Sequence, residues 1–244
     1  MAAPALLVTG STGLVGRALG GRRAIVGLPR GGDAPLRWDP QTGVVDDGRV
    51  VGAVVHLAGA GVADARWTPA RKKLLWDSRI VGTRTLVDWL IARPQRPEVL
   101  VSVAAVGIYG SRGDEELTEE SAPGDGFLAE LCQAWEAEAI RARDAGVRVV
   151  VLRLGVVLDA GGGALARMLP PWRLGLGGPV GGGRQWFPWI HMHDVVGGIE
   201  GALSDPAWSG VYNLVAPGVV RQGDFATALG AGPGCDWMNL PIAT

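Results

Sequence analysis

Residues 6–16 read Leu-Leu-Val-Thr-Gly-Ser-Thr-Gly-Leu-Val-Gly, and this stretch decides the fold. An apolar run typical of a strand leads into Gly10, Gly13 and Gly16, where a helix-like pattern starts. The first glycine permits a tight turn, the second lets a pyrophosphate approach the backbone, and the third lets helix and strand pack closely. The pattern predicts a dinucleotide-binding turn, with an unliganded glycine-rich turn as the alternative. Its contact residues would be Gly10, Ser11, Thr12, Gly13, Leu14, Val15 and Gly16.

Outward from this turn, short apolar runs alternate with helix-like segments. The helical patterns are clearest over residues 68–92 and 127–145, whereas the first helix must be short because Gly20 and Gly21 follow the turn closely. Alternation of this kind predicts an α/β fold, a Rossmann-type doubly wound parallel sheet. The expected strands cover residues 5–8, 24–28, 53–57, 99–103 and 147–152.

The composition limits the possible partners and compartments. The 244 residues include 23 basic and 24 acidic side chains, so no net charge attracts nucleic acid or an anionic membrane. Cys132 and Cys235 lack metal-binding spacing and are too few for a disulfide framework. No uncharged stretch is long enough to span a bilayer, and the first residues lack a basic leader. We therefore expect a cytoplasmic protein that binds neither nucleic acid nor membrane.

The second half differs in texture from the first. After Leu158 the sequence becomes rich in glycine, and an aromatic cluster of Trp186, Phe187 and Trp189 follows. Long glycine-rich loops let chain segments approach a ligand closely, although an ordinary flexible connector is the alternative. We expect a nucleotide-binding domain over residues 1–158 and a small Gly/Trp-rich substrate lobe over 159–244, interleaved with the first.

Arg30, just after the second predicted strand, bears on the choice of dinucleotide. An acidic residue in this place typically holds the ribose 2′-hydroxyl of NAD, whereas an arginine suits the 2′-phosphate of NADP. Arg30 therefore favours NADP(H) over NAD(H). A solvated surface arginine is the alternative, and Asp33 is a possible acidic partner further along the loop.

Four segments together resemble a known family: TGSTGLVG at 9–16, VVHLAGAGVADARWTPARKKLLWDSRIVGT at 54–83, SVAAVGIYG at 102–110 and GGGALARMLPPWRLGLGGPVGGGRQWFPWIHMHD at 161–194. They are similar to the atypical extended short-chain dehydrogenase/reductases of the YfcH type, a family of NDP-sugar epimerases, over about residues 6–229. The resemblance implies that Leu57, Ala58 and Gly59 line the cofactor, that Arg79 reaches the dinucleotide, and that Val156 lies near the nicotinamide. It also implies a nucleotide-sugar or other small substrate and a homodimer formed through the helices at 68–92 and 127–145.

The sequence departs from this superfamily at its acid–base pair, a tyrosine followed four residues later by a lysine. The only lysines, Lys72 and Lys73, precede both tyrosines, Tyr109 and Tyr212, so no such pair exists. In the matching helix, Phe127, Leu128 and Cys132 occupy the expected positions. Ordinary epimerase chemistry is therefore unsupported.

Two residues near the fourth predicted strand are candidate substitutes for the pair. Ser102, expected at the end of this strand, has a hydroxyl that can hold a substrate oxygen, and a structural strand-end role is the alternative. Tyr109 can donate a proton, but no lysine lowers the pKa of its phenol, and packing of its loop is the alternative.

The substrate lobe supplies three candidate ligand contacts: Arg184, Trp186 and His191. Arg184 can hold a phosphate, with a surface salt bridge as the alternative. His191, His193 and Asp194 suggest a metal site if both rings point from one strand, but a further histidine or cysteine is lacking and we expect none. Instead, Asp194 is expected to cap a helix over 195–203 and His191 to pack under the glycine-rich loop.

The end of the sequence also departs from the family, since it stops without the further helices expected there. Trp237, Met238 and Leu240 would either dock on the core or form an exposed patch. Two hypotheses follow. The protein is an NADP(H)-dependent epimerase or oxidoreductase that uses substitute groups, or it is a non-catalytic dinucleotide-binding protein that regulates or recruits a partner.

Overall fold

The computed structural model describes residues 4–31, 33–174 and 176–231, and its centre is a six-stranded sheet in which every pair of neighbours is parallel. The strand order is β11-β7-β6-β5-β1-β2. This arrangement confirms the predicted Rossmann-type α/β fold, and all five predicted strands are present with shifted ends: β1 (Ala5–Thr9), β2 (Val26–Leu28), β5 (Val51–His56), β6 (Val99–Ala105) and β7 (Arg148–Leu154). The sixth strand, β11 (Gly210–Leu214), was not predicted.

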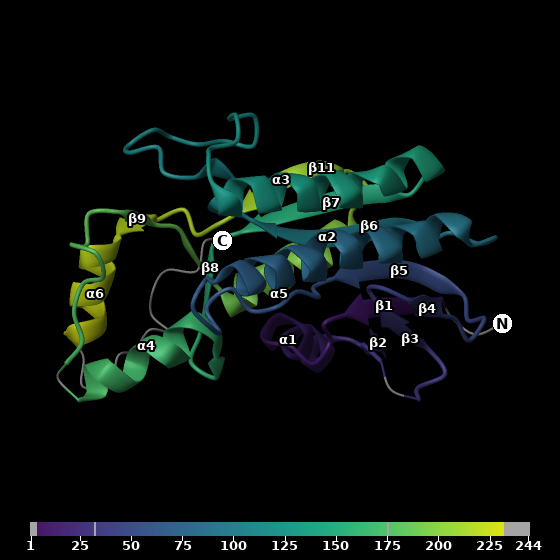
Figure 1. Cartoon of the computed structure of the whole chain (residues 1–244), viewed down its shortest axis with the longest axis horizontal. Helices are drawn as coiled ribbons and strands as arrows, with labels where there is room; N and C mark the ends of the chain where they lie inside the picture. Colours follow the sequence, from purple (N-terminus) through teal and green to yellow (C-terminus); the bar gives the residue numbers. More distant parts are fainter. Residues whose placement is uncertain (1–3, 32, 175, 232–244) are drawn as a thin grey trace.

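Helices cover both faces of the sheet (Figure 1). On one face α2 (Pro69–Ala92) and α3 (Phe127–Ile140), which continues into the 3-10 helix η2 (Arg141–Ala145), pack on a core that includes Leu7, Val54 and Leu100. On the other face α1 (Leu14–Arg22) and α5 (Met192–Ser204) pack on Leu6, Val8 and Val55. Successive strand residues thus alternate between two apolar layers.

The prediction of a short first helix is confirmed, because α1 has nine residues. Its single fully buried leucine, Leu19, contributes to the core, and α5 supplies the rest of that layer with Val195, Val196 and Ile199. A later helix therefore covers the area of the sheet that a longer α1 would cover.

A hairpin that the sequence analysis missed, formed by β3 (Arg37–Asp39) and β4 (Gly43–Val45), lies along α2. Trp38 is 2% exposed and packs against Gly82, where an added Cβ would lie 3.1 Å from the indole ring. The Thr85 hydroxyl donates a hydrogen bond of 2.6 Å to the carbonyl oxygen of Pro40. The hairpin also continues the sheet edge, since Trp38 forms a parallel bridge with Arg30 just after β2.

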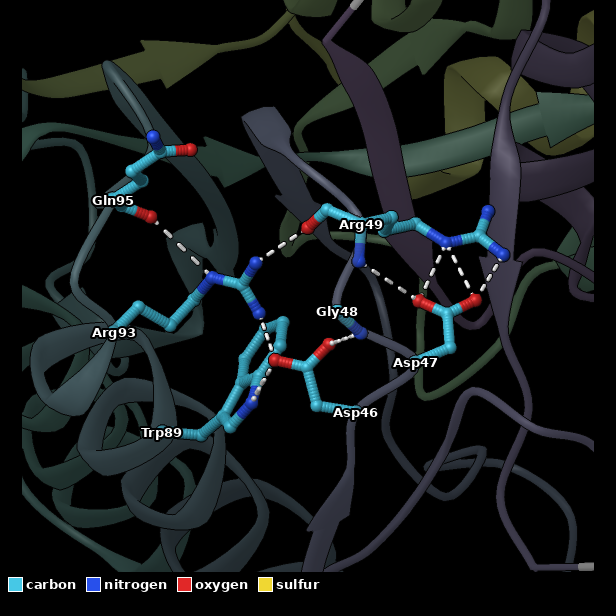
Figure 2. Close-up of polar contacts among 7 residues, drawn as sticks. All are labelled: Asp46, Asp47, Gly48, Arg49, Trp89, Arg93 and Gln95. Atoms are coloured by element: carbon cyan, nitrogen blue, oxygen red, sulfur yellow. Dashed lines mark hydrogen bonds and ion pairs between the residues drawn. The ribbon is translucent and has the colours of Figure 1, made fainter. Parts of the chain in front are cut away.

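The segment after β4 is fixed to the end of the same helix (Figure 2). The buried guanidinium of Arg93 pairs with Asp46 and donates a 2.6 Å hydrogen bond to the carbonyl oxygen of Arg49. The indole of Trp89 donates to the same Asp46 carboxylate at 3.2 Å and stacks under Arg93, 4.6 Å from ring centroid to guanidinium carbon. Positions 82, 85 and 89 of α2 and Arg93, its C-cap, lie on one side of the helix, so the helix holds both the hairpin and the segment around Asp46.

The remaining elements form a small lobe with its own core of Leu158, Leu165, Phe187, Phe225 and Leu229. Figure 1 shows α4, α6 and β9 beside one end of the sheet. The division into 1–158 and 159–244 stays a prediction, and both α5 and β11 return from the second range to the central sheet. The lobe elements are β8 (Val156–Asp159), α4 (Gly163–Arg173), β9 (Trp186–Phe187), β10 (Trp189–His191), β12 (Val220–Arg221) and α6 (Gln222–Gly230).

Within the described ranges, no helix combines the length and apolar character that crossing a bilayer would require. The expectations for Trp237, Met238 and Leu240 fall outside the described residues.

Candidate functional site

The turn between β1 and α1 has the close contacts that its glycines predict. Gly10 has a φ of 66°, and a Cβ added there would lie 3.0 Å from the backbone of Leu57 and Ala58. A Cβ on Gly16 would lie 2.4 Å from the carbonyl oxygen of Gly10. Gly13 is the N-cap of α1, where no side chain caps the helix and no acidic residue occupies the first turn. The helix N-terminus therefore keeps backbone donors and its positive dipole end available to an anion.

A buried chain of side chains fixes this turn to the neighbouring strand. Thr9 Oγ1 lies 2.7 Å from His56 Nδ1 and accepts hydrogen bonds from the N–H groups of Leu57 and Ala58 at 3.1 and 3.2 Å. His56 Nε2 lies 2.9 Å from the hydroxyl oxygen of Thr83 on α2. Because Thr9 Oγ1 already accepts two hydrogen bonds, we infer that its hydroxyl donates to an unprotonated His56 Nδ1. The imidazole proton then lies on Nε2, which donates to Thr83.

His56 stays neutral in this place. Complete burial, with a smaller contribution from the charge of Arg79, lowers its pKa to about 4. No local spacing pattern reveals these three hydrogen-bonded side chains, because they lie 47 and 27 residues apart. The one available signal was a polar residue at the end of each of two apolar strands.

The loop after β5 brings Leu57, Ala58 and Gly59 next to the glycine turn, and Arg79 lies against it. Arg79 Nη1 donates to the carbonyl oxygen of Ala60 at 3.0 Å, and a Cβ on Gly59 would lie 3.2 Å from the guanidinium carbon. The guanidinium stands 5.0 Å from the ring centroid of Trp135, and burial lowers its pKa. Arg79 has no carboxylate partner in the described ranges, so a buried positive charge beside the turn lacks a counter-ion.

Arg30 is exposed and lies just after β2. Two hydrogen bonds of 3.0 Å, from Gly31 N to the Trp38 carbonyl and from Trp38 N to the Pro29 carbonyl, fix its backbone. Asp33, the alternative acidic partner, is exposed. The hairpin thus holds the backbone of Arg30, while the side chain carries its charge into solvent.

The two acid–base candidates are both buried. Ser102 is 1% exposed and pairs with His56 and Val151 inside β6, so the expectation of a strand-end position is wrong. The strand continues to Ala105 because Ala104 and Ala105 still pair with β7. Whether Ser102 takes part in catalysis stays a prediction.

Tyr109 ends η1 (Val106–Tyr109) and is 4% exposed. Its hydroxyl donates to Asn213 Oδ1 at 2.7 Å and accepts from Arg153 Nη1 at 2.7 Å. Arg153 also forms a bidentate pair with Glu136 at 2.8 and 2.9 Å. Burial alone would lower the pKa of Arg153, but hydrogen bonds and the charge of Glu136 raise it above its usual range, so the guanidinium stays charged. The only proton on the Tyr109 hydroxyl is therefore engaged.

On α3, the positions of the missing acid–base pair carry no charge. Leu128 packs against Gly107, and a Cβ added to Gly107 would lie 3.8 Å from the Leu128 Cβ. Cys132 is 3% exposed, and burial, followed by the charge of Glu136, raises the pKa of its thiol to about 11. Phe127 packs edge-on against Trp67, with 5.7 Å between ring centroids. This face of α3 therefore offers a neutral thiol where a cation would be expected.

The structure separates the three predicted substrate contacts. Arg184 and Trp186 lie beside one hollow, whereas His191 ends β10 and caps α5, its Nδ1 accepting from His193 N at 3.1 Å. The helix predicted over 195–203 begins at Met192, so the expectation that Asp194 caps it is wrong. His191 is exposed, and His193 belongs to the helix, so the two rings do not project from one strand. No cluster of three or more metal-ligating side chains occurs among the described residues.

Val156, the expected nicotinamide contact, pairs with Trp189, and its N–H donates to the carbonyl oxygen of Pro188 at 2.7 Å. Trp186 comes three positions before Trp189, the residue that pairs with Val156. Sequence reasoning missed Arg153, Asp114 and Arg221, whose contacts join segments up to 107 residues apart.

Comparison with known proteins identifies the family. The family described as "NAD dependent epimerase/dehydratase family" matches residues 42–214. The chain belongs to this family. Membership of this family confirms the resemblance that was drawn from the glycine turn and the segments around residues 54–83 and 161–194.

Three similar proteins illustrate the relationship. An Arabidopsis thaliana "epimerase family protein SDR39U1 homolog, chloroplastic" is 45% identical over 181 residues, which cover 73% of this chain and 52% of the relative. The crystal structure of the human epimerase family protein SDR39U1 with NADPH is 36% identical, with a TM-score of 0.82, over 93% of this chain and 79% of that chain. The nucleoside-diphosphate sugar epimerase of Corynebacterium glutamicum is 38% identical, with a TM-score of 0.79, over 93% of this chain and 50% of that one.

These relatives support the binding of a nicotinamide dinucleotide by this fold. Two of the three proteins are about twice as long as the part that this chain matches.

Proposed function

We propose that the protein binds NADP(H) at the carboxyl ends of β1 and β5 and uses it in a transient hydride transfer. The observation that carries the proposal is the uncapped N-terminus of α1 after Gly10, with Arg79, which has no carboxylate partner among the described residues, beside the turn. Backbone donors would bind the pyrophosphate, and Arg30 would bind the 2′-phosphate. The nicotinamide, when bound, supplies or accepts the hydride. The human relative crystallised with NADPH supports this choice of cofactor.

The remaining cofactor contacts would come from the turn itself and from the strands on either side. Ser11, Thr12, Leu14 and Val15 surround the pyrophosphate in this proposal, and Val156 faces the nicotinamide. Leu57, Ala58 and Gly59 would follow the dinucleotide along the edge of the sheet, in the backbone positions that Thr9 fixes.

The substrate would be a nucleotide-sugar or another small carbonyl or alcohol, bound on the side of the lobe near Arg184 and Trp186. Tyr109 and Ser102 are the proposed acid–base groups. For Tyr109 to transfer a proton, its hydroxyl must leave Asn213 while Arg153 continues to donate to it. The guanidinium would then stabilise a developing phenolate, as a cation next to an acid does in general.

A second function has an observation in its favour. The Tyr109 hydroxyl is engaged and the Cys132 thiol is neutral, so neither side chain is a free acid or base. A non-catalytic protein that binds the dinucleotide and changes its affinity for a partner would need no such group.

Cofactor preference is tested by titrating the intrinsic Trp fluorescence with NADPH and NADH. We expect wild type to prefer NADPH and Arg30→Ala to lose most of this preference. Arg23→Ala is the matched control, because Arg23 is an exposed arginine just after α1. Equal affinities of wild type for the two dinucleotides would reject the role of Arg30.

Catalysis is tested by single-turnover absorbance at the nicotinamide band with a panel of sugar nucleotides and small alcohols. A change in absorbance that Tyr109→Phe removes supports the enzyme. Cofactor binding without any change in absorbance favours the second function, and a partner whose affinity responds to NADPH would then support it.

We further propose that the protein works in the cytoplasm as a homodimer through α2 and α3. Sedimentation equilibrium tests the dimer, and a monomer at high micromolar concentration would reject it.

A further inference from the structure

A hollow in the small lobe, apart from the glycine turn, has an unusual balance of charge. It has a volume of about 500 Å³ and is lined by Asp114, Gly182, Gly183, Arg184, Arg221 and Asp224. These residues come from the loop after η1, the loop before β9, β12 and the first turn of α6. Two arginines and two aspartates face it, so its lining has no net charge.

One arginine and one aspartate of the hollow are already paired. Arg221 forms an ion pair with Asp114, donates to the carbonyl oxygen of Arg184 at 2.7 Å, and stacks 3.8 Å above the ring centroid of Trp186. Trp186 Nε1 donates to the same Asp114 carboxylate at 3.0 Å. Hydrogen bonds from Arg221 and then from Trp186 lower the pKa of Asp114, so this carboxylate stays ionised. The three side chains form a fixed wall.

The other two charges are open. Arg184 and Asp224 are exposed, and within the described ranges neither side chain has a hydrogen bond or ion pair. Gly183 holds their two loops together, because its carbonyl oxygen accepts from Gly223 N at 2.8 Å and a Cβ on it would lie 2.9 Å from Gly223 Cα. A ligand in this hollow therefore meets one free guanidinium and one free carboxylate on a rigid support.

This pair of charges discriminates between ligands. A diphosphate carries at least two negative charges, whereas the unpaired side chains of the hollow offer one cation, Arg184, next to one carboxylate, Asp224, which repels it. A single carboxylate can instead bind Arg184, while a neighbouring hydroxyl or ammonium group donates to Asp224. Arg221, which is paired with Asp114 and held on the Trp186 ring, lines the hollow beside these two groups.

The hollow also lies within reach of the proposed nicotinamide position. Trp189, which pairs with Val156, comes three positions after Trp186, and three extended residues span about 10 Å at most. The side chain that holds Asp114 of the hollow and the residue paired with Val156 therefore belong to one short segment of the lobe.

We propose that the hollow is a substrate subsite for a small carboxylate with an adjacent hydroxyl or ammonium group, of the sugar-acid class. Of the two substrate classes in the proposed function, the hollow therefore favours the small carbonyl or alcohol over the nucleotide-sugar. Calling it a substrate subsite rests on the proposed function, whereas the ligand class rests on the hollow alone.

Calorimetric titration of the full chain tests the proposal with three probes: gluconate, which has a carboxylate beside hydroxyls, glucose, which lacks the carboxylate, and UDP. We expect wild type to bind gluconate at least tenfold more tightly than glucose or UDP. Arg184→Gln should weaken gluconate binding at least tenfold and Asp224→Asn severalfold. Arg173→Gln, an exposed arginine of α4 outside the hollow, should bind gluconate like wild type.

Three results would overturn the proposal: no binding of gluconate, UDP binding more tightly than gluconate, or Arg184→Gln binding gluconate as wild type does. Asp224→Asn separates the charge argument from a general loss of binding, because it should strengthen any residual UDP binding. Thermal unfolding of each variant checks that it is folded. The gluconate titration needs no cofactor, so a separate titration with NADPH shows whether the proposed function fails independently.

Discussion

The glycine turn and the region after β6 differ in how their polar groups are used. At the glycine turn, the buried Thr9–His56–Thr83 chain satisfies the internal donors, while the N-terminus of α1 keeps its backbone donors available and Arg79 has no carboxylate partner among the described residues. After β6, Tyr109, Arg153 and Glu136 satisfy one another. The turn that suits a dinucleotide is thus open to a ligand, whereas the tyrosine that could replace the missing acid–base pair is bonded into the core.

The largest change should come from breaking the buried ion pair beside Tyr109. Glu136→Gln leaves the Arg153 charge uncompensated at a site where the side chains are 7% and 9% exposed. We expect the free energy of unfolding to fall by about 3–5 kcal/mol in urea denaturation. Glu115→Gln is the control, since its pair with Arg112 is exposed, and it should cost less than about 1 kcal/mol. An equal cost for both variants would show that burial of the pair is not what matters.

The second change removes the close approach within the glycine turn. Gly16→Val places side-chain atoms where even a Cβ would lie 2.4 Å from the Gly10 carbonyl oxygen, so the turn must move. We expect NADPH affinity to fall about a thousandfold, or about 4 kcal/mol, in a calorimetric titration. Gly21→Ala, in the same helix with no atom within 4 Å of the added Cβ, should bind normally. Unchanged NADPH affinity of the valine variant would show that the glycine turn does not bind the dinucleotide.

The third prediction concerns pH. The unfolded chain protonates His56 near its ordinary pKa of 6.5, whereas the folded protein resists protonation down to about pH 4. Unfolding is therefore favoured as pH falls through this interval, at about 1.4 kcal/mol per pH unit and about 3 kcal/mol in total.

The contribution of His56 is isolated by comparing the urea stability of wild type and His56→Gln from pH 7 to pH 4. Other groups titrate alike in both proteins, so the difference between them should shrink as the pH falls. A difference that does not depend on pH would mean that His56 is not buried in its neutral form.

The smallest effect tests how firmly the Tyr109 hydroxyl is tied into the core. Tyr109→Phe removes the hydrogen bond to Asn213 and the one from Arg153, and we expect a loss of about 1–3 kcal/mol in unfolding free energy. NADPH affinity should stay within twofold of wild type, because the phenol lies after β6 and not at the glycine turn. A large loss of NADPH affinity would place Tyr109 at the cofactor instead.

Local patterns predicted most of the fold. The glycine turn, the apolar strands and the long helix over 69–92 depend on residues close together in the sequence, and the structure contains all of them. The start of α5 was misplaced because a histidine, His191, occupies the cap that an aspartate was expected to fill. The hairpin of β3 and β4 was missed because its stabilising contacts lie on α2, some 45 residues away.

Less of the candidate site than of the fold could be predicted from the sequence. Spacing located the phosphate-binding turn, and the absent tyrosine–lysine pair could be read directly. Neither the engagement of Tyr109 by Asn213, 104 residues away, nor the wall of Trp186 and Arg221 on Asp114 has a local signal. Such contacts are set by the order of strands in the sheet and by the loops that meet at its carboxyl edge.

The most direct test of the central claim is a calorimetric titration of the full chain with NADPH. The account predicts saturable binding at one site per chain, retained in Tyr109→Phe and lost in Gly16→Val. A titration of wild type without heat of binding across a range of temperatures, or one that the valine variant reproduces, would contradict it.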